Sequence, residues 1–360
     1  MPRTRVLVVD DAVVVRRIVT DALGADPALE VVGTAPNGRI ALAKIPQLNP
    51  DIITLDVEMP EMDGLETLVE LRKLYPDLPV IMFSTLTERG TKVAMDALLR
   101  GANDYVTKPA NVGSVAEAIQ RIREQLVPKI HALCGKVAAP APPRATAPRP
   151  PRRSSAPSGR IEAVAIGVST GGPNALSELL PQLPADLRVP VVVVQHMPPM
   201  FTRLLAERLD ARCTLKVHEA VHGQPIAAGN IYIAPGDHHL EVHKRGAALV
   251  AALTQAPPEN SCRPSADVLF RSAVGVFGGG LLAVVLTGMG HDGRRGAEEV
   301  HEAGGRIVVQ DEATSVVWGM PGSVVAAGIA DEVRPLGQIG QRIIELVGSS
   351  TAPRPREVSA

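Results

Sequence analysis

The stretch AIGVSTGGPNAL, Ala165–Leu176, joins an apolar run to a cluster of glycines and then to a helix-like pattern. A strand, a glycine turn and a helix follow one another in this way where a loop binds phosphate at a helix N-terminus. In this sequence Ser169 occupies the place of the second glycine of a dinucleotide-binding loop. The stretch therefore predicts either a phosphate-binding turn or a turn that presents a serine nucleophile.

The bulk composition indicates a two-domain globular protein with no general affinity for nucleic acid. The 360 residues suffice for two domains of ordinary size, and the net charge is -1. Acidic residues interrupt the N-terminal apolar run, and no apolar run approaches the ~20 residues of a membrane span. Three widely separated cysteines, Cys134, Cys213 and Cys262, fit buried thiols in a reducing compartment better than a disulfide framework or a zinc site. We therefore expect a soluble cytoplasmic protein with no membrane insertion.

A segment rich in proline and arginine divides the chain. Residues 136–160 hold seven prolines and five arginines but no Asp or Glu, a composition that favours an extended linker over a folded core. The sequence predicts a first domain at 1–125, a linker at 126–160, a second domain at 161–350 and a tail at 351–360.

Short apolar runs alternate with longer helical patterns on both sides of this linker. Runs such as RVLVVD and AVAIGVS are typical of buried strands, and stretches such as GLETLVELRKLY are typical of helices. The alternation indicates two α/β domains with doubly wound, largely parallel sheets. Because such sheets carry their chemistry beyond the carboxyl ends of the strands, the residue after each apolar run is a candidate site residue.

Charged and hydroxyl side chains follow the strands of the first domain. Asp10 and Asp11 come after the first apolar run, Asp56 after the third, Ser84 after the fourth and Lys108 after the fifth. Clustered carboxylates repel one another unless a divalent cation is present, and oxygen ligands of this kind suit Mg²⁺. A carboxylate beside Mg²⁺ and a lysine can attack a phosphoryl donor, because both cations neutralise charge on the transferred group.

The first domain resembles the receiver domain of bacterial response regulators over residues 3–125. The segments VVDD, ITLDVEMPEMDG and DYVTKP carry the resemblance. It implies a flavodoxin-like fold in which Asp56 accepts a phosphoryl group and a switch transmits this event to the surface. The implied Mg²⁺ ligands are Asp10, Asp11 and Asp56, and the implied switch residues are Ser84, Tyr105 and Lys108.

A hydroxyl, an imidazole and a carboxylate follow three strands of the second domain. Ser169 follows AVAIGV, His196 follows VPVVVVQ, and Asp292 follows LLAVVLTGMGH. Residues 167–171 have the form G-x-S-x-G, which places a serine on a tight strand-to-helix turn. A serine hydroxyl needs a base to attack at neutral pH, and the imidazole needs a carboxylate to orient it. The sequence therefore predicts a Ser-His-Asp triad, in a chain order that differs from that of α/β-hydrolases.

The second domain resembles the catalytic domain of chemotaxis protein-glutamate methylesterases, the CheB-type family, over residues 161–347. IGVSTGGPNAL, VVVVQHMPPMFT and LTGMGHDGRRGA are among the segments that carry the resemblance. It implies a Rossmann-like three-layer catalytic domain. It also implies phosphorylation-regulated hydrolysis of glutamate γ-methyl esters on methyl-accepting chemotaxis receptors, and deamidation of particular receptor glutamines. It also implies a chemotaxis histidine kinase as phosphodonor and no cofactor for the esterase reaction. We expect the backbone amides of Thr170 and Met289 to bind the oxyanion.

Two other classes of protein share parts of this pattern. A DNA-binding response regulator would need a helix-turn-helix pattern or a basic recognition stripe, which the C-terminal part of the sequence lacks. A dinucleotide-binding oxidoreductase would need glycine at position 169 and an acid roughly 20 residues later, where the chain has the apolar run Val191–Val194. His238, His239 and His243 suggest a metal site, but lacking a partner of matching register they are expected in solvent or along a cleft.

Overall fold

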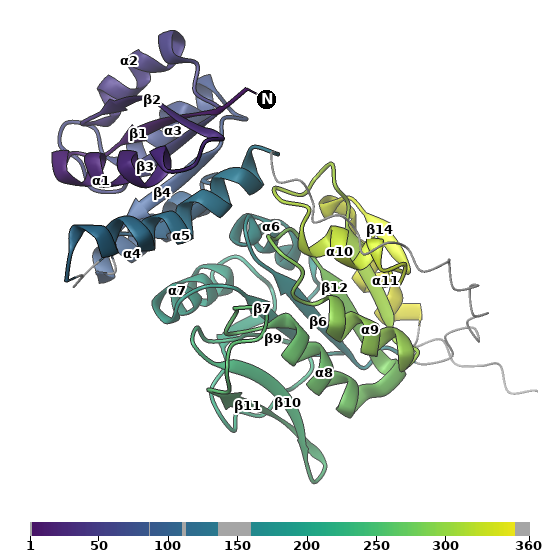
Figure 1. Cartoon of the computed structure of the whole chain (residues 1–360). Helices are drawn as coiled ribbons and strands as arrows, with labels where there is room; N and C mark the ends of the chain where they lie inside the picture. Colours follow the sequence, from purple (N-terminus) through teal and green to yellow (C-terminus); the bar gives the residue numbers. More distant parts are fainter. Residues whose placement is uncertain (1, 86, 110–112, 136–159, 350–360) are drawn as a thin grey trace, which may run out of the picture. The chain divides into compact units, whose positions relative to one another are not determined.

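Buried apolar runs form the strands of two separate parallel sheets in the computed structural model (Figure 1). The structure describes residues 2–85, 87–109, 113–135 and 160–349. The chain divides into two compact units, Met1–Ala141 and Pro142–Ala360. Most of the predicted linker, residues 136–159, and the predicted tail at 351–360 lie outside the described residues.

The first domain is a five-stranded parallel sheet covered by helices. Its elements are β1 (Thr4–Val9), α1 (Val13–Gly24), β2 (Leu29–Ala35), α2 (Gly38–Leu48), β3 (Ile52–Asp56), α3 (Gly64–Leu74), β4 (Val80–Ser84), α4 (Glu88–Leu98), β5 (Asp104–Thr107) and α5 (Val115–Leu133). The strand order β2-β1-β3-β4-β5 is the flavodoxin-like order that the sequence predicts. Alternate residues of β1, Val6 and Val8, face a core shared with α1 and α5. The carboxyl ends of β1, β3, β4 and β5 therefore meet at one edge.

Helix α5 continues past the domain boundary that the sequence predicts at residue 125. Residues 126–133 are helical, so assigning them to the linker was wrong. The apolar spacing of the helix persists there, and Leu126 and Ile130 are fully buried in the core that α5 shares with α1. Neither α5 nor any other described helix has the length and apolar character needed to cross a lipid bilayer.

The second domain is built on a seven-stranded sheet. Its elements are β6 (Ala163–Val168), α6 (Gly172–Leu179), the 3₁₀ helix η1 (Leu180–Gln182), β7 (Val191–Gln195), α7 (Pro199–Asp210), β8 (Lys216–Glu219), β9 (Asn230–Ile233), β10 (His239–Arg245), β11 (Ala248–Thr254), α8 (Ala266–Phe277), the 3₁₀ helix η2 (Gly278–Gly280), β12 (Leu281–Val285), α9 (Arg294–Glu302), β13 (Arg306–Gln310), α10 (Met320–Ala326), β14 (Glu332–Arg334) and α11 (Leu336–Ser349). The strand order is β14-β13-β12-β6-β7-β9-β8, with every neighbouring pair parallel.

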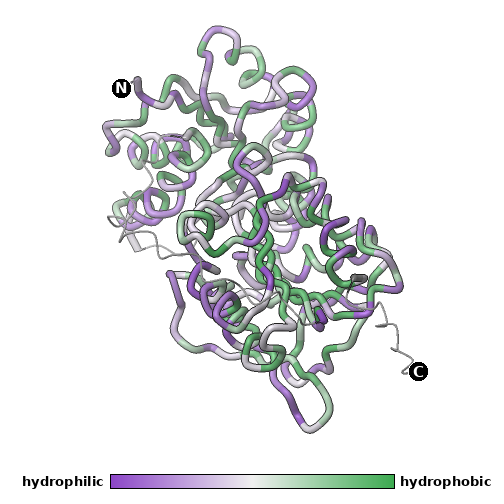
Figure 2. Tube along the Cα trace, turned by 90° about the vertical axis from the view of Figure 1, so that its right-hand side faces the viewer, coloured by the Kyte–Doolittle hydropathy of each residue, from purple (hydrophilic) through white to green (hydrophobic). Residues whose placement is uncertain are grey.

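Helices cover both faces of this sheet, as a three-layer domain requires. Helix α8 packs against β6, β12 and α9 on one face, and α6 packs against α7 and α11 on the other (Figure 1). Every residue of the strands β6 and β12 between them is buried, and hydrophobic stretches run through the interior of the trace in Figure 2. Strand β6 and helix α8 pack closely at Gly167. A Cβ at this position would lie only 2.7 Å from Ala266 Cβ. This contact fixes the carboxyl end of β6 relative to the start of α8.

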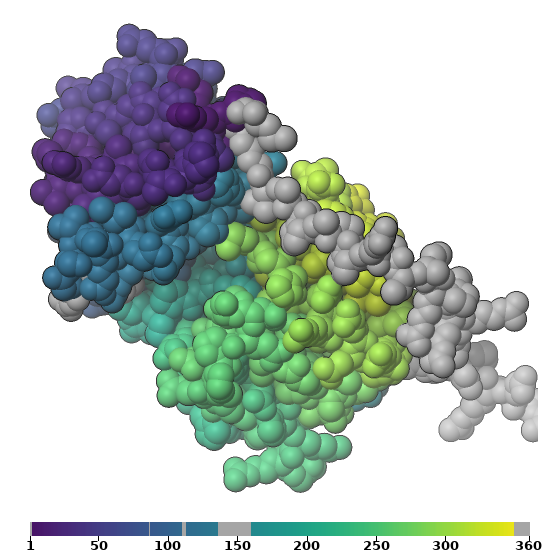
Figure 3. Space-filling view, viewed as in Figure 1, coloured from purple at the N-terminus to yellow at the C-terminus, as the bar shows by residue number. Residues whose placement is uncertain are grey.

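The hairpin β10–β11 is the only pair of named strands in the described part of the second domain that is antiparallel. Helix α8 packs against β10, and Leu240 and Val242 of that strand are buried in the domain core. The tip of the hairpin, residues 244–248, is exposed and stands out from the surface (Figure 3). The hairpin therefore extends the α8 side of the core beyond the edge of the sheet.

Truncation of Phe270 to alanine should destabilise the second domain. The ring is completely buried on α8 and lies against the positions of Gly167 in β6 and Gly293 at the start of α9. Its loss leaves a cavity, so we expect the free energy of unfolding of this domain, measured by urea denaturation, to fall by about 3–5 kcal/mol. The control Val221→Ala, at a side chain 63% exposed, should change it by less than about 0.5 kcal/mol. Equal effects of the two substitutions would contradict this assignment of the core.

Candidate active site

The order of the strands reverses beside β6, and the candidate triad lies at this point. β6 pairs with β7 on one side and with β12, much later in the chain, on the other. Ser169 follows β6, His196 follows β7, and Asp292 lies in the turn between β12 and α9. Open α/β sheets bind ligands at such reversals, beyond the carboxyl ends of the strands. All three predicted residues therefore belong to the same edge of the sheet.

A tight glycine turn carries Ser169 from β6 into α6. Gly171 has φ 79°, a left-handed conformation that favours glycine. A Cβ at Gly172 would lie 1.8 Å from Oε1 of Gln195, so that position also excludes a side chain. The carbonyl oxygen of Ser169 accepts hydrogen bonds from the amide of Gly172, at 2.8 Å, and from Nε2 of Gln195, at 3.0 Å. These constraints hold the serine in a fixed turn, as the G-x-S-x-G pattern predicts.

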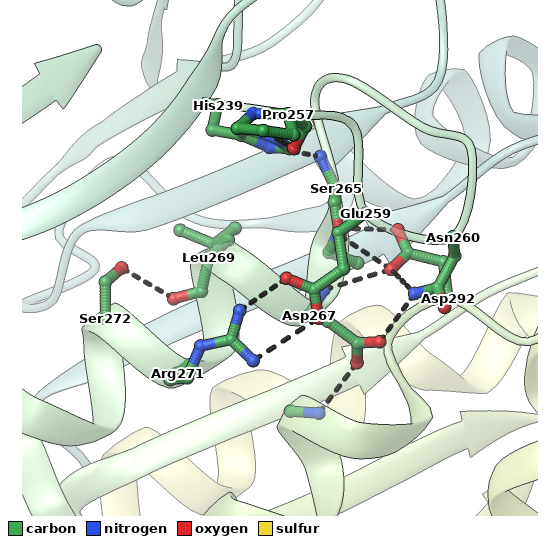
Figure 4. Close-up of polar contacts among 12 residues, drawn as sticks. His239, Pro257, Glu259, Asn260, Ser265, Asp267, Leu269, Arg271, Ser272 and Asp292 are labelled. Carbon is green, nitrogen blue, oxygen red and sulfur yellow. Dashed lines mark hydrogen bonds and ion pairs between the residues drawn. The ribbon is translucent and has the colours of Figure 1, made fainter. Parts of the chain in front are cut away.

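Asp292 is a buried carboxylate with hydrogen-bond donors on both oxygens. Oδ2 accepts from His196 Nε2 at 2.8 Å and from the amide of Ala266 at 2.6 Å. Oδ1 accepts from Ser265 Oγ at 2.7 Å and from Asn260 Nδ2 at 2.8 Å (Figure 4). Burial alone would raise the pKa of Asp292, but His196 and the other donors together lower it below the usual range. The carboxylate therefore stays ionised and fixes the imidazole beside it.

The imidazole of His196 has its two nitrogens in different surroundings. Nε2 faces Asp292, and Nδ1 lies 3.6 Å from Sγ of Cys262. Burial disfavours the imidazolium form, but the hydrogen bond to Asp292 and the neighbouring sulfur outweigh it, so the pKa of His196 is raised. Because Nε2 donates to the carboxylate, Nδ1 is left to exchange a proton, the reverse of the chymotrypsin arrangement. Among the described residues the Ser169 hydroxyl makes no hydrogen bond to this ring, so the serine–histidine contact stays a prediction.

The two residues expected to supply oxyanion amides lie on the loops that flank Ser169. Thr170 is buried, and its carbonyl accepts from Thr287 Oγ1 at 3.0 Å. Met289 follows Gly288, where a Cβ would lie 2.8 Å from Ser169 Cβ. The loop after β12 therefore passes against the serine, which supports the prediction that both amides serve the same oxyanion.

The predicted phosphorylation site lies at the carboxyl edge of the first sheet. One oxygen each of Asp10, Asp11 and Asp56 lies within 4.8 Å of the others. Lys108 Nζ is 2.8 Å from Oδ2 of both Asp10 and Asp56. Burial raises the pKa of Asp56 to about 6, an effect that Lys108 opposes and the Asp10 carboxylate reinforces. Three carboxylates with a single lysine still carry excess negative charge, so this donor set fits Mg²⁺.

The predicted switch residues lie close to this carboxylate cluster. Ser84 and Lys108 line a pocket of about 200 Å³ together with Asp56. Tyr105 is buried one strand away, with Lys129 Nζ 5.1 Å from the centre of its ring. The placement of Ser84 at the pocket supports its contact with a phosphoryl group. The coupling of Ser84 to Tyr105 stays a prediction.

The histidines of the hairpin do not form a metal site among the described residues. His239 is buried, so the expectation of a solvated or cleft-lining side chain was wrong for it. Its Nε2 lies 3.1 Å from the carbonyl of Pro257, and its Nδ1 accepts from the amide of Ser265 at 3.2 Å. His243 is half-exposed and pairs with Glu241. His239 thus supports the backbone of Ser265, a donor to Asp292.

The loop before α8 contributes residues that the sequence analysis did not assign to the site. Asn260 donates from one amide nitrogen to both Asp292 and Asp267, at 2.8 Å each (Figure 4). Cys262, expected from sequence to be one of three buried thiols, is only partly buried and contacts the imidazole of His196. Neither residue follows a predicted strand. Examining the residues after each apolar run, which identified the candidate triad, therefore could not identify Asn260 or Cys262.

Comparisons with known proteins assign both domains. Residues 164–343 match the CheB methylesterase family, and residues 6–120 match the response regulator receiver domain. A protein-glutamate methylesterase/protein-glutamine glutaminase from Trichodesmium erythraeum is 52% identical over 352 residues, covering 97% of this chain and 100% of that protein. A protein of the same name from a Nocardioides species is 54% identical over 357 residues, covering 96% of this chain and 95% of that protein.

The second domain also resembles a solved structure. The catalytic domain of CheB methylesterase from Thermotoga maritima has a TM-score of 0.51 and 44% sequence identity, and it covers 52% of this chain and 98% of that one. The match of residues 164–343 to the CheB methylesterase family argues against a DNA-binding or dinucleotide-binding function for the second domain. Because two relatives match almost from end to end and each domain matches its own family, the chain belongs to the CheB methylesterase family and carries a response regulator receiver domain.

Proposed function

We propose that the chain hydrolyses glutamate γ-methyl esters on methyl-accepting chemotaxis receptors, under control of phosphorylation at Asp56. The observation that carries this proposal is the hydrogen bond of 2.8 Å between His196 and a buried, ionised Asp292, at the strand end next to the glycine turn of Ser169. Relatives that match nearly the whole chain bear the name of this activity. The function is that of an adaptation enzyme in chemotaxis.

The proposed reaction is two acyl transfers at Ser169. The hydroxyl oxygen attacks the ester carbonyl while His196 Nδ1 takes its proton. Collapse of the tetrahedral intermediate returns that proton to the leaving methoxide, so methanol departs and an acyl-enzyme remains. Water then attacks in the same way, and its proton passes through Nδ1 to Ser169 as the glutamate is released. Asp292 holds the ring and stabilises the imidazolium in both halves.

The same site accounts for deamidation of receptor glutamines. A glutamine side chain offers the same acyl group as the ester, with ammonia instead of methanol as leaving group. Proton transfer from His196 to the leaving nitrogen matters more for glutamine than transfer to the leaving oxygen does for the ester, because an amide ion is a poorer leaving group than methoxide. The amides of Thr170 and Met289 would stabilise the oxyanion of either substrate.

Phosphorylation is proposed to act through the first domain. Mg²⁺ held by Asp10, Asp11 and Asp56 would supply positive charge for phosphoryl transfer. Asp56 accepts the phosphoryl group from a chemotaxis histidine kinase, and Lys108 and Ser84 bind its oxygens. Ser84 and Tyr105 then couple phosphorylation of Asp56 to a conformational change at the surface of the domain. We place this activity in the cytoplasm, where the three cysteines, all free thiols here, stay reduced.

Replacement of Ser169 by alanine should lower methanol release from methylated receptors by roughly a thousandfold or more, because no other group supplies the nucleophile. The measurement is methanol release under saturating receptor. Ser177→Ala, a second serine further along α6, is the matched control and should keep wild-type activity. Near-normal release by Ser169→Ala would show that the nucleophile has been assigned wrongly.

The pH profile should report the pKa of His196. The imidazole must be neutral to accept a proton, so kcat/KM rises as pH passes its pKa. Because Asp292 raises that pKa, we expect the midpoint of the acid limb above the ordinary value of about 6.5. The residual activity of Asp292→Asn should have its midpoint at lower pH. A wild-type midpoint at or below the ordinary histidine value would contradict this electrostatic picture.

Replacement of Asp56 by asparagine should abolish the response to a phosphodonor. The amide cannot form the acyl phosphate, so acetyl phosphate with Mg²⁺ should change the methanol release rate of wild type but not of Asp56→Asn. Asp21→Asn, at an exposed carboxylate of the same domain, is the control and should respond as wild type. A full response in Asp56→Asn would place the phosphoacceptor elsewhere.

A further inference from the structure

The contact between Cys262 and His196 joins a soft sulfur ligand to an imidazole nitrogen. Sγ lies 3.6 Å from Nδ1, and ligand atoms of Cys262, His196 and Asp292 all lie within 4.8 Å of one another. We propose that His196 Nδ1 and Cys262 Sγ form a reversible binding site for Zn²⁺, and that the bound ion inhibits the esterase. The inhibition rests on the proposed role of His196 as base, whereas the binding does not.

The distance between the two ligand atoms suits a zinc ion. Zinc binds imidazole nitrogen at about 2.0–2.1 Å and thiolate sulfur at about 2.3 Å in tetrahedral sites. These bond lengths place nitrogen and sulfur roughly 3.5 Å apart. The observed separation of 3.6 Å therefore accepts the ion with little movement of either side chain.

Asp292 orients the imidazole ligand from the far side of the ring without binding the ion itself. Its Oδ2 accepts from Nε2, so the nitrogen that would bind zinc is backed by a carboxylate on the other ring nitrogen. Zinc-bound histidines are usually oriented in this way. Oδ1 of Asp292 is occupied by Ser265 and Asn260, so the aspartate stays outside the coordination sphere. Water fills the remaining positions, which favours reversible rather than structural binding.

The loop around Cys262 holds the thiol in place without the metal. The amide of Cys262 donates to the carbonyl of Glu259 at 2.8 Å, and the amide of Glu259 donates back at 3.1 Å. Asn260 and Ser261 between them have φ of 51° and 63°, in the left-handed region. The side chain of Asn260 ties this turn to Asp267 and Asp292 (Figure 4). The ligand pair is thus built into the fold, which lowers the entropic cost of binding.

The two sites should prefer different metal ions, because their ligand atoms differ. Asp10, Asp11 and Asp56 offer oxygen atoms alone, which suit Mg²⁺. Nitrogen and sulfur favour zinc over magnesium. Millimolar Mg²⁺ can therefore serve the first domain while leaving Nδ1 of His196 free. An ion on Nδ1 prevents that nitrogen from accepting the proton of Ser169, so the esterase stops.

The binding test uses the full-length protein with Mg²⁺ present and Co²⁺ as a spectroscopic substitute for Zn²⁺. We expect a near-ultraviolet thiolate-to-cobalt charge-transfer band in wild type and in the matched control Cys213→Ala, and its loss in Cys262→Ala and Cys262→Ser. Zinc affinity, measured by competition with a chromophoric chelator, should fall at least tenfold in both Cys262 variants. Circular dichroism identifies a variant that fails to fold, and the serine variant keeps the shape of the side chain.

The inhibition test measures methanol release with Zn²⁺ added to wild type. We expect inhibition that a chelator reverses and that excess Mg²⁺ does not reproduce. A charge-transfer band or zinc affinity that survives in folded Cys262→Ser would overturn the site. Zinc that binds through Cys262 but leaves methanol release unchanged would overturn the inhibition alone. The cobalt band needs no catalysis, so a failure of the proposed esterase function would leave the binding result intact.

Discussion

The arrangement of the second domain depends on one buried charge, the carboxylate of Asp292. An ionised carboxylate at 2% exposure is costly unless donors surround it. The chain supplies them from three segments: the start of α8, the preceding loop through Asn260, and His196 after β7. A helix N-terminus favours negative charge, so α8 stabilises the form of Asp292 that orients the imidazole. The need to satisfy this charge therefore brings together elements that lie far apart in the sequence.

The glycine turn at Ser169 has the backbone arrangement of a phosphate-binding loop, but we propose that it presents a nucleophile instead of binding phosphate. Both need a residue in the left-handed region and a helix that starts directly after a strand, which Gly171 and α6 provide here. At Gly172 a side chain would collide with Gln195, and Gln195 in turn holds the Ser169 carbonyl. A bound phosphate would be the permanent occupant of such a turn. In the proposed reaction at Ser169, the adjacent amides would meet negative charge only while the oxyanion exists.

Positions at or shortly beyond the ends of strands could be predicted from the sequence, whereas Asn260 and Cys262, in the loop before α8, could not. Parallel sheets gather their carboxyl ends at one edge, so reading the residue after each apolar run located the carboxylates of the first domain and Ser169, His196 and Asp292 of the second. Asn260 and Cys262 lie in an irregular loop whose path depends on hydrogen bonds to Asp267 and Asp292. No local pattern encodes those bonds. The burial of His239 was missed for the same reason, since its partners come from that loop.

The contact between the Cys262 thiol and the imidazole of His196 raises the question of why Ser169, and not Cys262, is proposed as the nucleophile. A thiol is the stronger nucleophile, and Cys262 already contacts Nδ1 of His196. An acyl transfer also needs amides that bind the oxyanion within reach of the attacking atom. The amides of Ala266 and Asp267 at the start of α8 are committed to Asp292, and the amide of Cys262 donates to Glu259. The thiol of Cys262 therefore contacts His196 beside amides that already have other acceptors, which supports the proposal that Ser169 is the nucleophile.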